Sequence, residues 1–256
     1  MRIGIEAQRL FRPHKHGMDR VALELIRNLQ VLDQENEYFI FVKPDEDNQV
    51  ITETENFKII EIQSKSYAIW EQIKLPKAVK EHKCDILHCT SNTAPFGLKT
   101  TLITTLHDVI FNETSILKLL STKASWYQKL GNLYRRLIVN YVVSSSDKLI
   151  TVSNFENANI KRLYKLDNDK IQTVHNGVNQ SFTLINDEER LSQVKQKYML
   201  PESFVLHIGN TDPRKNTARV LQAFSEYISS SKDQVNLVLV GLSSERLQSM
   251  LKQRSK

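Results

Sequence analysis

The chain has 256 residues, of which 40% are hydrophobic, and only 7 are glycine and 6 are proline. This composition excludes a disordered or collagen-like chain and indicates one large globular domain or two of ordinary size. The 35 basic and 29 acidic side chains leave a net charge of +6, which favours anionic partners: phosphates, nucleic acid or an acidic membrane surface. The N-terminal residues lack the apolar core of a signal peptide, and no run reaches the roughly 18 apolar residues of a membrane span, so we expect a cytoplasmic protein.

In the first 176 residues, short apolar runs alternate with helical patterns. The expected strands are 2–7, 37–42, 57–62, 84–90, 99–108, 147–153 and 170–176, and the expected helices are 19–32, 68–82, 115–143 (in two pieces) and 153–166. Asp19 is a candidate N-cap of the first helix, and Ser153 or Asn154 of the last. Pro76 predicts a break or kink inside 68–82.

The only two cysteines, Cys84 and Cys89, lie on one predicted strand and lack a metal-ligand spacing. An odd separation on a strand places them on opposite faces. We expect buried free thiols, which fits a reducing compartment.

Strands alternating with helices, without two-residue hairpins, predict a parallel sheet with helices on both faces. Such a sheet binds its ligand outside the carboxyl ends of the strands. Polar residues that fall at those ends are Gln8, Arg9, Ser91, Asn92, His107, Asp108, Ser153 and Asn176.

A polar, turn-rich stretch at 176–193 marks a domain boundary, after which the alternation restarts. We therefore expect a first domain at 1–176 and a second α/β unit at 177–256. The second unit is short: it has strands at 203–209 and 235–241 and helices at 216–229 and from Ser243, whereas a free-standing doubly wound sheet usually has more strands.

The segment "HIGNTDPRKN" (207–216) places two cations where a strand leads into a helix. The first turn of a helix has unpaired N–H groups and partial positive charge, and it binds anions readily. Gly209 would let a ligand approach the backbone, while Arg214 could hold a phosphate bidentately and Lys215 could act as a point charge. The alternative is that both cations are ordinary solvated surface residues.

Five motifs, in order along nearly the whole chain, resemble the retaining glycosyltransferases of family 4, which have two facing Rossmann-like domains (the GT-B fold). The motifs are "RLFRPHKHGMDRVALELIRNL", "LITTLHDVIF", "LITVSNF", "VHNGVN" and "FVLHIGNTDPRKN". The resemblance implies an α/β GT-B fold with a complete N-terminal domain and the first part of a C-terminal nucleotide-sugar-binding domain. It also implies transfer of a sugar, as in hexosyltransferases, from a nucleotide-sugar donor to a saccharide or lipid-linked acceptor, with retention at the anomeric carbon and without an essential metal or cofactor.

By the same resemblance, Gly17, Gly209, Arg214 and Lys215 match the donor diphosphate site. Many family members have an arginine at the position of Asn210, so the diphosphate role is assigned to Arg214 and Lys215.

His107, followed by Asp108, matches the histidine that reaches the donor sugar, where it would act without ionising; the alternative is a strand-terminal histidine paired with Asp108. Ser153 is better explained as an N-cap than as a ligand contact, and Asn176 and Gly177 as a hinge turn. His88 fits a packed core histidine as well as a cleft residue.

Residues 116–143 mix aromatic residues, including Trp126 and Tyr127, with several cations. One interpretation is a surface helix pair packed on the sheet. The other is a patch that binds an anionic membrane, such as the inner face of the plasma membrane, where family acceptors are often lipid-linked. No motif supports binding to nucleic acid.

The family's paired glutamates, separated by seven residues, are not found, because Glu245 is the last acidic residue and has no partner. We therefore expect a glycosyltransferase truncated in its C-terminal domain. Two functions follow: an enzyme or enzyme subunit of cell-surface polysaccharide synthesis, or a non-catalytic remnant that acts as a binding module.

Overall fold

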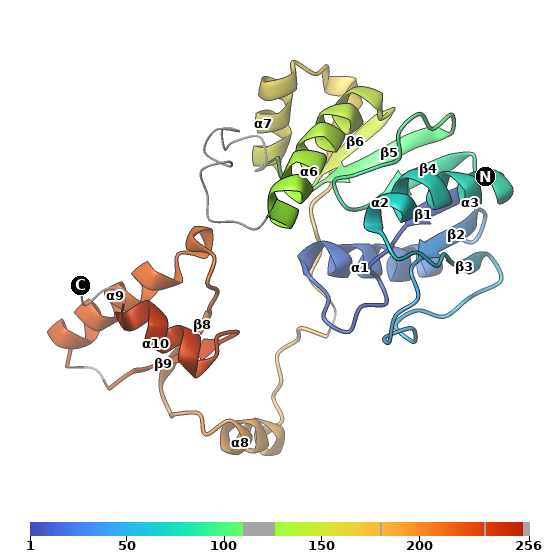
Figure 1. The fold of residues 1–256 in the computed structure, drawn as a ribbon. Coiled ribbons are helices and arrows are strands. Elements are labelled where there is room, and N and C mark those ends of the chain that lie inside the picture. Colours follow the sequence, from blue (N-terminus) through green and yellow to red (C-terminus); the bar gives the residue numbers. More distant parts are fainter. Residues whose placement is uncertain (110–125, 180, 233, 253–256) are drawn as a thin grey trace. The chain divides into compact units, whose positions relative to one another are not determined.

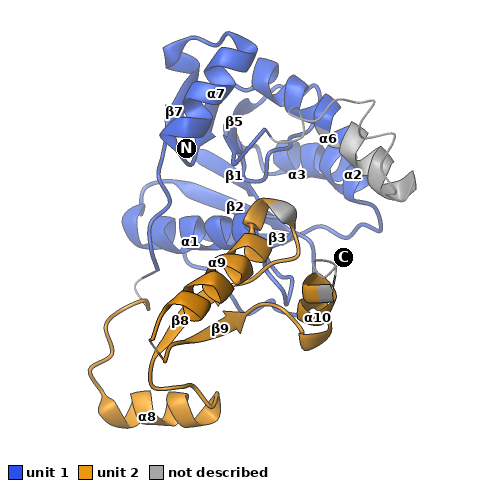
Figure 2. Ribbon diagram, turned by 90° about the vertical axis from the view of Figure 1, so that its left-hand side faces the viewer, with its two compact units in different colours: residues 1–179 blue, residues 180–256 orange. Residues whose placement is uncertain are grey.

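The structure is a computed structural model that describes all residues except 110–125, 180, 233 and 253–256. The chain divides into two compact units, Met1–Asn179 and Gln180–Lys256, shown in separate colours in Figure 2. The division falls close to the boundary predicted after residue 176. Each unit is described here by itself.

Unit 1 is built on a seven-stranded sheet in the order β3-β2-β1-β4-β5-β6-β7, and every neighbouring pair is parallel (Figure 1). The strands are β1 (Arg2–Glu6), β2 (Glu37–Val42), β3 (Phe57–Glu61), β4 (Ile86–Cys89), β5 (Thr101–Leu106), β6 (Lys148–Thr151) and β7 (Ile171–Thr173). The chain runs outward from β1 to β3 and then returns to β4 on the other side of β1. The strand order therefore reverses between β1 and β4, which is where an open parallel sheet forms its ligand crevice.

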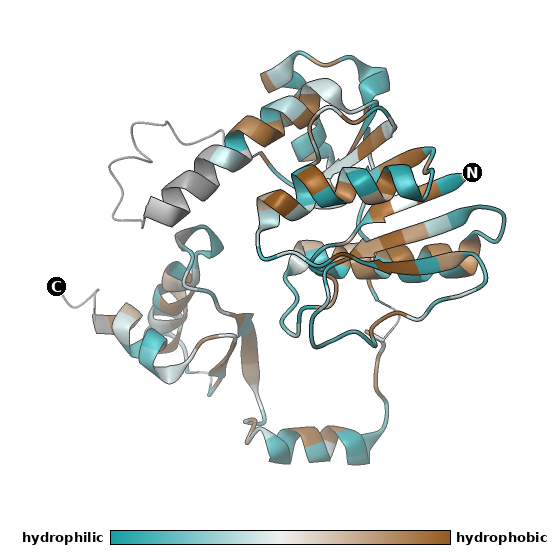
Figure 3. Ribbon diagram, turned by 45° about the vertical axis from the view of Figure 1, so that its right-hand side comes forward, coloured by the Kyte–Doolittle hydropathy of each residue, from teal (hydrophilic) through white to brown (hydrophobic). Residues whose placement is uncertain are grey.

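Helices cover both faces of this sheet, as the alternating pattern predicted. They are α1 (Gly17–Leu32), α2 (Tyr67–Ile69), a π-helical segment (Trp70–Lys74), α3 (Leu75–Glu81), α6 (Trp126–Ser145) and α7 (Asn154–Tyr164), with a 3-10 turn at Asn168–Lys170. On one face Leu23 and Ile26 of α1 pack with Ile5 of β1. On the other face, Trp70 and Ile138 belong to a core that also holds side chains of β2, β4 and β6. Hydrophobic residues lie both on the strands and on parts of the helices of unit 1 (Figure 3).

The predicted N-cap is confirmed for helix α7 but not for helix α1. Ser153 caps α7, because its Oγ accepts a hydrogen bond from the Glu156 amide at 3.1 Å. The assignment of Asp19 as an N-cap was wrong: His16 is the N-cap, and Asp19 is the third residue of the helix. Its carboxyl accepts from the His16 amide at 2.9 Å, which satisfies that amide from inside the helix.

The break predicted near Pro76 takes the form of the π-helical segment Trp70–Lys74, which ends as α3 begins. Proline has no N–H to donate to the carbonyl one turn earlier, and the wider π turn absorbs this loss of α-helical pairing. The segment carries a buried glutamate, Glu71.

Both cysteines are free and buried, as predicted. Their placement on opposite faces was wrong. Cys84 precedes β4, after the left-handed residue Lys83 with φ of 51°, so the strand alternation does not apply to it. Both thiols lie in the same hydrophobic core, and burial raises the pKa of the Cys84 thiol to about 11.

Unit 2 contains a two-stranded parallel sheet with β8 (Phe204–Ile208) and β9 (Asn236–Val240). Its helices are α8 (Glu188–Lys197), α9 (Thr217–Ser230) and α10 (Ser244–Lys252), and a 3-10 turn spans Pro213–Lys215. Helix α8 lies in the stretch that the sequence pattern assigned to turns. Asp187 caps it by accepting from the Arg190 amide at 3.0 Å, and none of its residues is buried; its few apolar residues, Leu191 and Val194, stand among charged and polar ones and give only a weak apolar signal.

Candidate functional site

The predicted strand-end residues of the central strands meet at one edge of the sheet. Glu6 at the end of β1 pairs with Cys89 at the end of β4, and Cys89 pairs with Thr104 of β5. Because these strands are parallel and in this register, the segments that follow them leave the sheet side by side. The edge therefore carries Gln8, Arg9, Ser91, Asn92, His107 and Asp108.

His107 is the first residue after β5, and its ring is half-buried. Its backbone amide donates to Asn92 Oδ1 at 2.7 Å, and its ring Nε2 lies 3.0 Å from the carbonyl oxygen of Thr90. Since a carbonyl can only accept, Nε2 carries the proton and Nδ1 keeps a lone pair. Burial lowers the pKa of His107, so the ring is neutral at pH 7. The ring is therefore bonded to Thr90, and not to Asp108 as the alternative interpretation supposed.

The loop of residues 90–93 holds this histidine and is itself buried, with no member more than 9% exposed. Asn92 adopts a left-handed conformation with φ of 67°, which asparagine tolerates better than most residues, and its amide donates to the Thr105 carbonyl at 3.1 Å. The Thr90 hydroxyl donates to the Glu6 carbonyl at 2.9 Å. The loop thus joins the ends of β1, β4 and β5.

Arg9, in the loop after β1, forms an ion pair with Asp19 of α1. The distance from Arg9 Nε to Asp19 Oδ1 is 3.2 Å, and the carboxyl side chain is 1% exposed. Asp19 therefore joins the first loop to the start of α1, where Gly17 lies exposed. A Cβ added at Gly17 would meet nothing within 4 Å, so packing within unit 1 does not require a glycine there. Its role beside donor phosphate stays a prediction.

Two buried glutamates at this edge were missed. Glu6 is 3% exposed; its Oε1 accepts from the Gln8 amide at 3.0 Å, and its Oε2 has no hydrogen-bond partner within the described part of the chain. Burial, together with the nearby Glu71, raises the pKa of Glu6. Glu71, in the π-helical segment, is 1% exposed. An ionisable residue inside the apolar run 2–7 was the one available signal for Glu6, whereas a glutamate in an amphipathic helix such as 68–82 resembles a solvated residue.

His88 lies on strand β4 of the sheet. Its Nε2 lies 2.9 Å from the Thr105 hydroxyl, and burial, with a smaller contribution from His107, lowers the pKa of His88 to about 4. The residue is partly exposed and lies beside His107, so both interpretations of His88 stay predictions.

In unit 2 the turn at Pro213–Lys215 leads directly into α9, as the sequence predicted. The Arg214 guanidinium donates to Asp212, with Nη2 2.6 Å from Oδ2. This contact lowers the pKa of Asp212 to about 2. Asn216 precedes the helix with φ of 57° and makes no side-chain cap, while the buried Thr217 hydroxyl accepts from the Asn210 amide at 2.9 Å. The backbone amide of Asn210 thus holds the turn onto the helix.

Gly209 follows β8 and is buried against Leu242. A Cβ at Gly209 would lie 2.6 Å from Leu242 Cδ1 and 2.9 Å from its Cγ. A side chain at residue 209 would therefore force Leu242 to move, independently of any ligand. Its contact with a donor stays a prediction.

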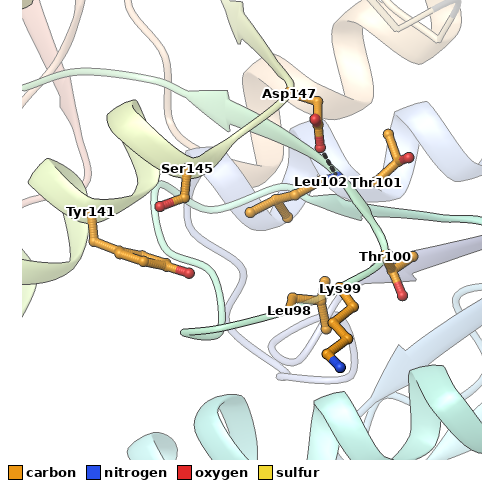
Figure 4. Close-up of a pocket in the computed structure, with 8 residues that line it drawn as sticks. All are labelled: Leu98, Lys99, Thr100, Thr101, Leu102, Tyr141, Ser145 and Asp147. Atoms are coloured by element: carbon orange, nitrogen blue, oxygen red, sulfur yellow. Dashed lines mark hydrogen bonds between the residues drawn. The ribbon is translucent and has the colours of Figure 1, made fainter.

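The other predicted residues have simpler surroundings. Ser153 caps a helix, and Asn176 and Gly177 lie exposed in the segment that follows β7, so their hinge role stays a prediction. The polar cavity of about 230 Å³ in Figure 4 lies elsewhere, since its lining includes Thr101 and Leu102 at the amino end of β5. Among the described residues, no group of His, Cys, Asp and Glu side chains is arranged to hold a metal ion. The helices described in the structure include none long and apolar enough to cross a membrane.

The sequence profile of glycosyltransferase family 4 matches residues 16–182, which is more than half of the chain. The chain belongs to glycosyltransferase family 4. Among curated proteins, the O-antigen chain mannosyltransferase B of Escherichia coli is 26% identical to this family 4 chain over 241 residues. That alignment covers 88% of the chain and 60% of the relative, so the chain spans less than two thirds of the relative's length.

Solved structures share the fold of this family 4 chain at low sequence identity. The Anabaena protein HepE, in complex with UDP-glucose, has a TM-score of 0.63 at 12% identity over 100% of this chain and 65% of its own. The lipopolysaccharide outer core galactosyltransferase WaaB has a TM-score of 0.52 at 14% identity, with the same two coverages. The parallel α/β architecture and these neighbours confirm the predicted GT-B type fold, with a first Rossmann-like domain and part of a second.

Proposed function

We propose that this chain is the acceptor-side domain and the beginning of the donor-side domain of a retaining glycosyltransferase. The observation that carries the proposal is the family 4 match over residues 16–182, which includes His107 and Asn92 at the edge of the sheet. In this proposal unit 1 presents the acceptor and His107, and unit 2 holds the donor diphosphate.

The relatives support a nucleotide-sugar donor and a glycan acceptor. HepE was solved with UDP-glucose, and the E. coli relative is an O-antigen mannosyltransferase. We extend these properties to this chain: it would move a hexosyl group to a saccharide or lipid-linked saccharide during the synthesis of a cell-surface polysaccharide. A cytoplasmic location, with contact to the inner face of the plasma membrane, belongs to the same proposal.

The roles of the side chains follow from their charge and geometry. A neutral His107 with its proton on Nε2 offers Nδ1 as an acceptor, so it can bind a sugar hydroxyl and stay un-ionised during the reaction. The leaving diphosphate gains negative charge as the glycosidic bond to the sugar breaks. Lys215, Arg214 and the N-terminus of α9 would stabilise that charge without a metal.

The test is sugar transfer by a protein in which these residues are joined to a complete second unit, for example the matching C-terminal part of the E. coli relative. Nucleotide-activated mannose and UDP-glucose are supplied with a saccharide acceptor, and NMR identifies the anomer formed. Retention of configuration supports the proposal. Inversion would refute the retaining mechanism, and absence of transfer with every donor, despite intact folding, would favour the binding-module function instead.

A further inference from the structure

The carboxyl group of Glu71 is the centre of a buried hydrogen-bond cluster in unit 1. Oε1 accepts from the Tyr67 hydroxyl at 3.0 Å and from the Thr93 hydroxyl, and Oε2 accepts from the Tyr134 hydroxyl at 2.8 Å and from Gln72 Nε2 at 2.9 Å. Burying a carboxyl group is costly unless its oxygens are satisfied, and here both oxygens have two donors each. The cluster therefore specifies the positions of the groups that donate to it.

One of these donors, Thr93, belongs to the loop of residues 90–93, whereas the others lie on helical segments. At the start of the same loop, the Thr90 hydroxyl donates to the carbonyl of Glu6. The loop is thus attached at one end to β1 and at the other to the π-helical segment, through two side-chain hydroxyls. Both attachments are buried, where a hydrogen bond is not exchanged for one with water.

Between these attachments, the loop makes both contacts that orient His107. The Thr90 carbonyl accepts from the ring Nε2, and Asn92 Oδ1 accepts from the backbone amide. The four residues of the loop therefore connect Glu71 to the His107 ring, with a hydrogen bond from Thr93 to Glu71 at one end and one from the ring to Thr90 at the other. The left-handed backbone at Asn92 adds a reason for the attachments, because a non-glycine residue in that region keeps its conformation only when its surroundings hold it.

We propose that Glu71 is a positioning residue for His107 and acts through the hydroxyl of Thr93. The expected effect of Glu71 on catalysis rests on the proposed function, whereas its effect on the orientation of His107 does not. Glu71 would not touch the sugar; it would hold the loop so that the ring presents Nδ1 in one orientation. Displacing the ring would weaken the hydrogen bond from a sugar hydroxyl to Nδ1 and so lower the rate of transfer.

The competing explanation is that Glu71 only stabilises the fold. Two substitutions separate the explanations, because each removes one hydroxyl that donates to Glu71. Thr93→Val removes the hydroxyl by which Glu71 and Tyr67 hold the loop, since the Tyr67 hydroxyl lies 2.8 Å from Thr93 Oγ1, whereas Tyr134→Phe removes a donor on α6 and leaves both Thr93 contacts intact. Thr93→Ser is the rescue variant, since it restores a hydroxyl at the same position.

The first measurement is NMR of the His107 imidazole in this chain, without substrate. The Nε2 proton bonded to Thr90 should exchange slowly with water in the unmodified chain, in Tyr134→Phe and in Thr93→Ser, and faster in Thr93→Val. Equal exchange in Thr93→Val and Tyr134→Phe would overturn the proposal. If Thr93→Val does not fold by circular dichroism, Glu71→Gln replaces it, with faster exchange expected and unchanged exchange again contradicting the proposal.

The second measurement is sugar transfer by the protein with a complete second unit. Thr93→Val should lower kcat several-fold, up to the roughly tenfold loss expected when His107 itself is removed, with little change in KM for the donor, while Tyr134→Phe should keep the kcat of the unmodified protein. A loss shared equally by both variants would indicate a purely structural role and overturn the proposal. If the unmodified protein transfers no sugar, the proposed function fails, and the exchange measurement still decides whether Glu71 positions His107.

Discussion

Arg214 donates from Nε to both carboxyl oxygens of Asp212, at 3.1 Å each, and Nη2 adds a contact of 2.6 Å to one of them. The arginine proposed to bind the donor diphosphate is therefore already bonded to a carboxylate two residues before it. A phosphate at the N-terminus of α9 would compete with Asp212 for this guanidinium. Lys215, next in the chain, would add a second positive charge at the same turn.

Opposite effects on the donor site are expected from Lys215→Ala and Asp212→Asn. Removing the Lys215 cation should lower kcat for transfer by roughly 10²–10³-fold, since the leaving diphosphate loses a stabilising charge in the transition state. Asp212→Asn should tighten UDP binding, because it removes a competing negative charge. Calorimetric titration and initial rates check both, with the exposed Lys232→Ala on the same unit as a control. If Lys215→Ala and Lys232→Ala behave alike, the pair at the turn is only a surface feature.

Replacing His107 with phenylalanine should lower kcat about tenfold, which corresponds to the loss of one hydrogen bond of ~1.4 kcal/mol to the reacting sugar. The rate of the unmodified protein should not change between pH 7 and 8, because burial lowers the pKa of His107 and its ring is neutral there. The charged groups that act on the ring are Asp108, Arg9 and Asp19, with His88 beside it. A pH–rate profile from 5 to 8 checks this expectation, and a rate that requires a protonated His107 near pH 7 would contradict it.

Acid should destabilise unit 1 through His88. Its pKa falls from 6.5 to about 4 on folding, so the unfolded chain binds a proton more readily in that window. Stability is therefore lost as the pH falls from about 6.5 toward 4, by up to about 1.4 kcal/mol per pH unit for one such group. Buried Glu6 acts in the opposite direction, since its pKa is raised and its neutral form is favoured in the fold.

Urea unfolding at pH 7 and pH 5 measures the contribution of His88 to the pH dependence of stability. His88→Gln should lose less stability between these pH values than the unmodified chain does. Thr105→Val removes the hydroxyl bonded to His88 but keeps the ring. It should be less stable than the unmodified chain at both pH values, with the same difference in stability between pH 7 and pH 5. An unchanged difference in His88→Gln would mean that the ring does not titrate as described.

Gly209→Ala should destabilise unit 2 by about 1–3 kcal/mol, as expected for an overpacked site. The added methyl group would lie 2.6 Å from Leu242 Cδ1, so the leucine has to move. In a protein that already carries Leu242→Ala, adding Gly209→Ala should cost less stability than it costs in the unmodified protein. Thermal unfolding of the four proteins forms the cycle. Additive losses would show that the glycine is needed for another reason.

Association with membranes is expected if residues 116–143 act as an interfacial patch. Residues 110–125 and the side chains of 126–133 lie outside those that the structure describes, while Ile138 and Val142 of α6 pack in the core. The protein should sediment with anionic vesicles and be released as salt rises, because screening weakens attraction between cations and anionic lipids. Neutral vesicles provide the control, and equal recovery on both would leave the patch without an electrostatic role.

Local sequence chemistry determined the strands and most helices of this protein. Parallel strands buried on both faces leave apolar runs such as 37–42, and a serine before a helix identifies its own N-terminus, as Ser153 does. The same reasoning placed His107 and Asn92 at strand ends, because a strand end is a local property. It missed α8, since the two apolar residues of this exposed helix, Leu191 and Val194, give only a weak apolar period.

Only the tertiary structure decided what these residues contact. The strand order brings the ends of β1, β4 and β5 together, so that Thr90 rather than the adjacent Asp108 bonds to the His107 ring. The π-helical segment turns Glu71 inward, where hydroxyls from distant parts of the chain satisfy it. Packing against Leu242 decides why residue 209 is glycine. Each of these depends on side chains far apart in sequence, and burial sets their charge and hydrogen bonding, which no local pattern encodes.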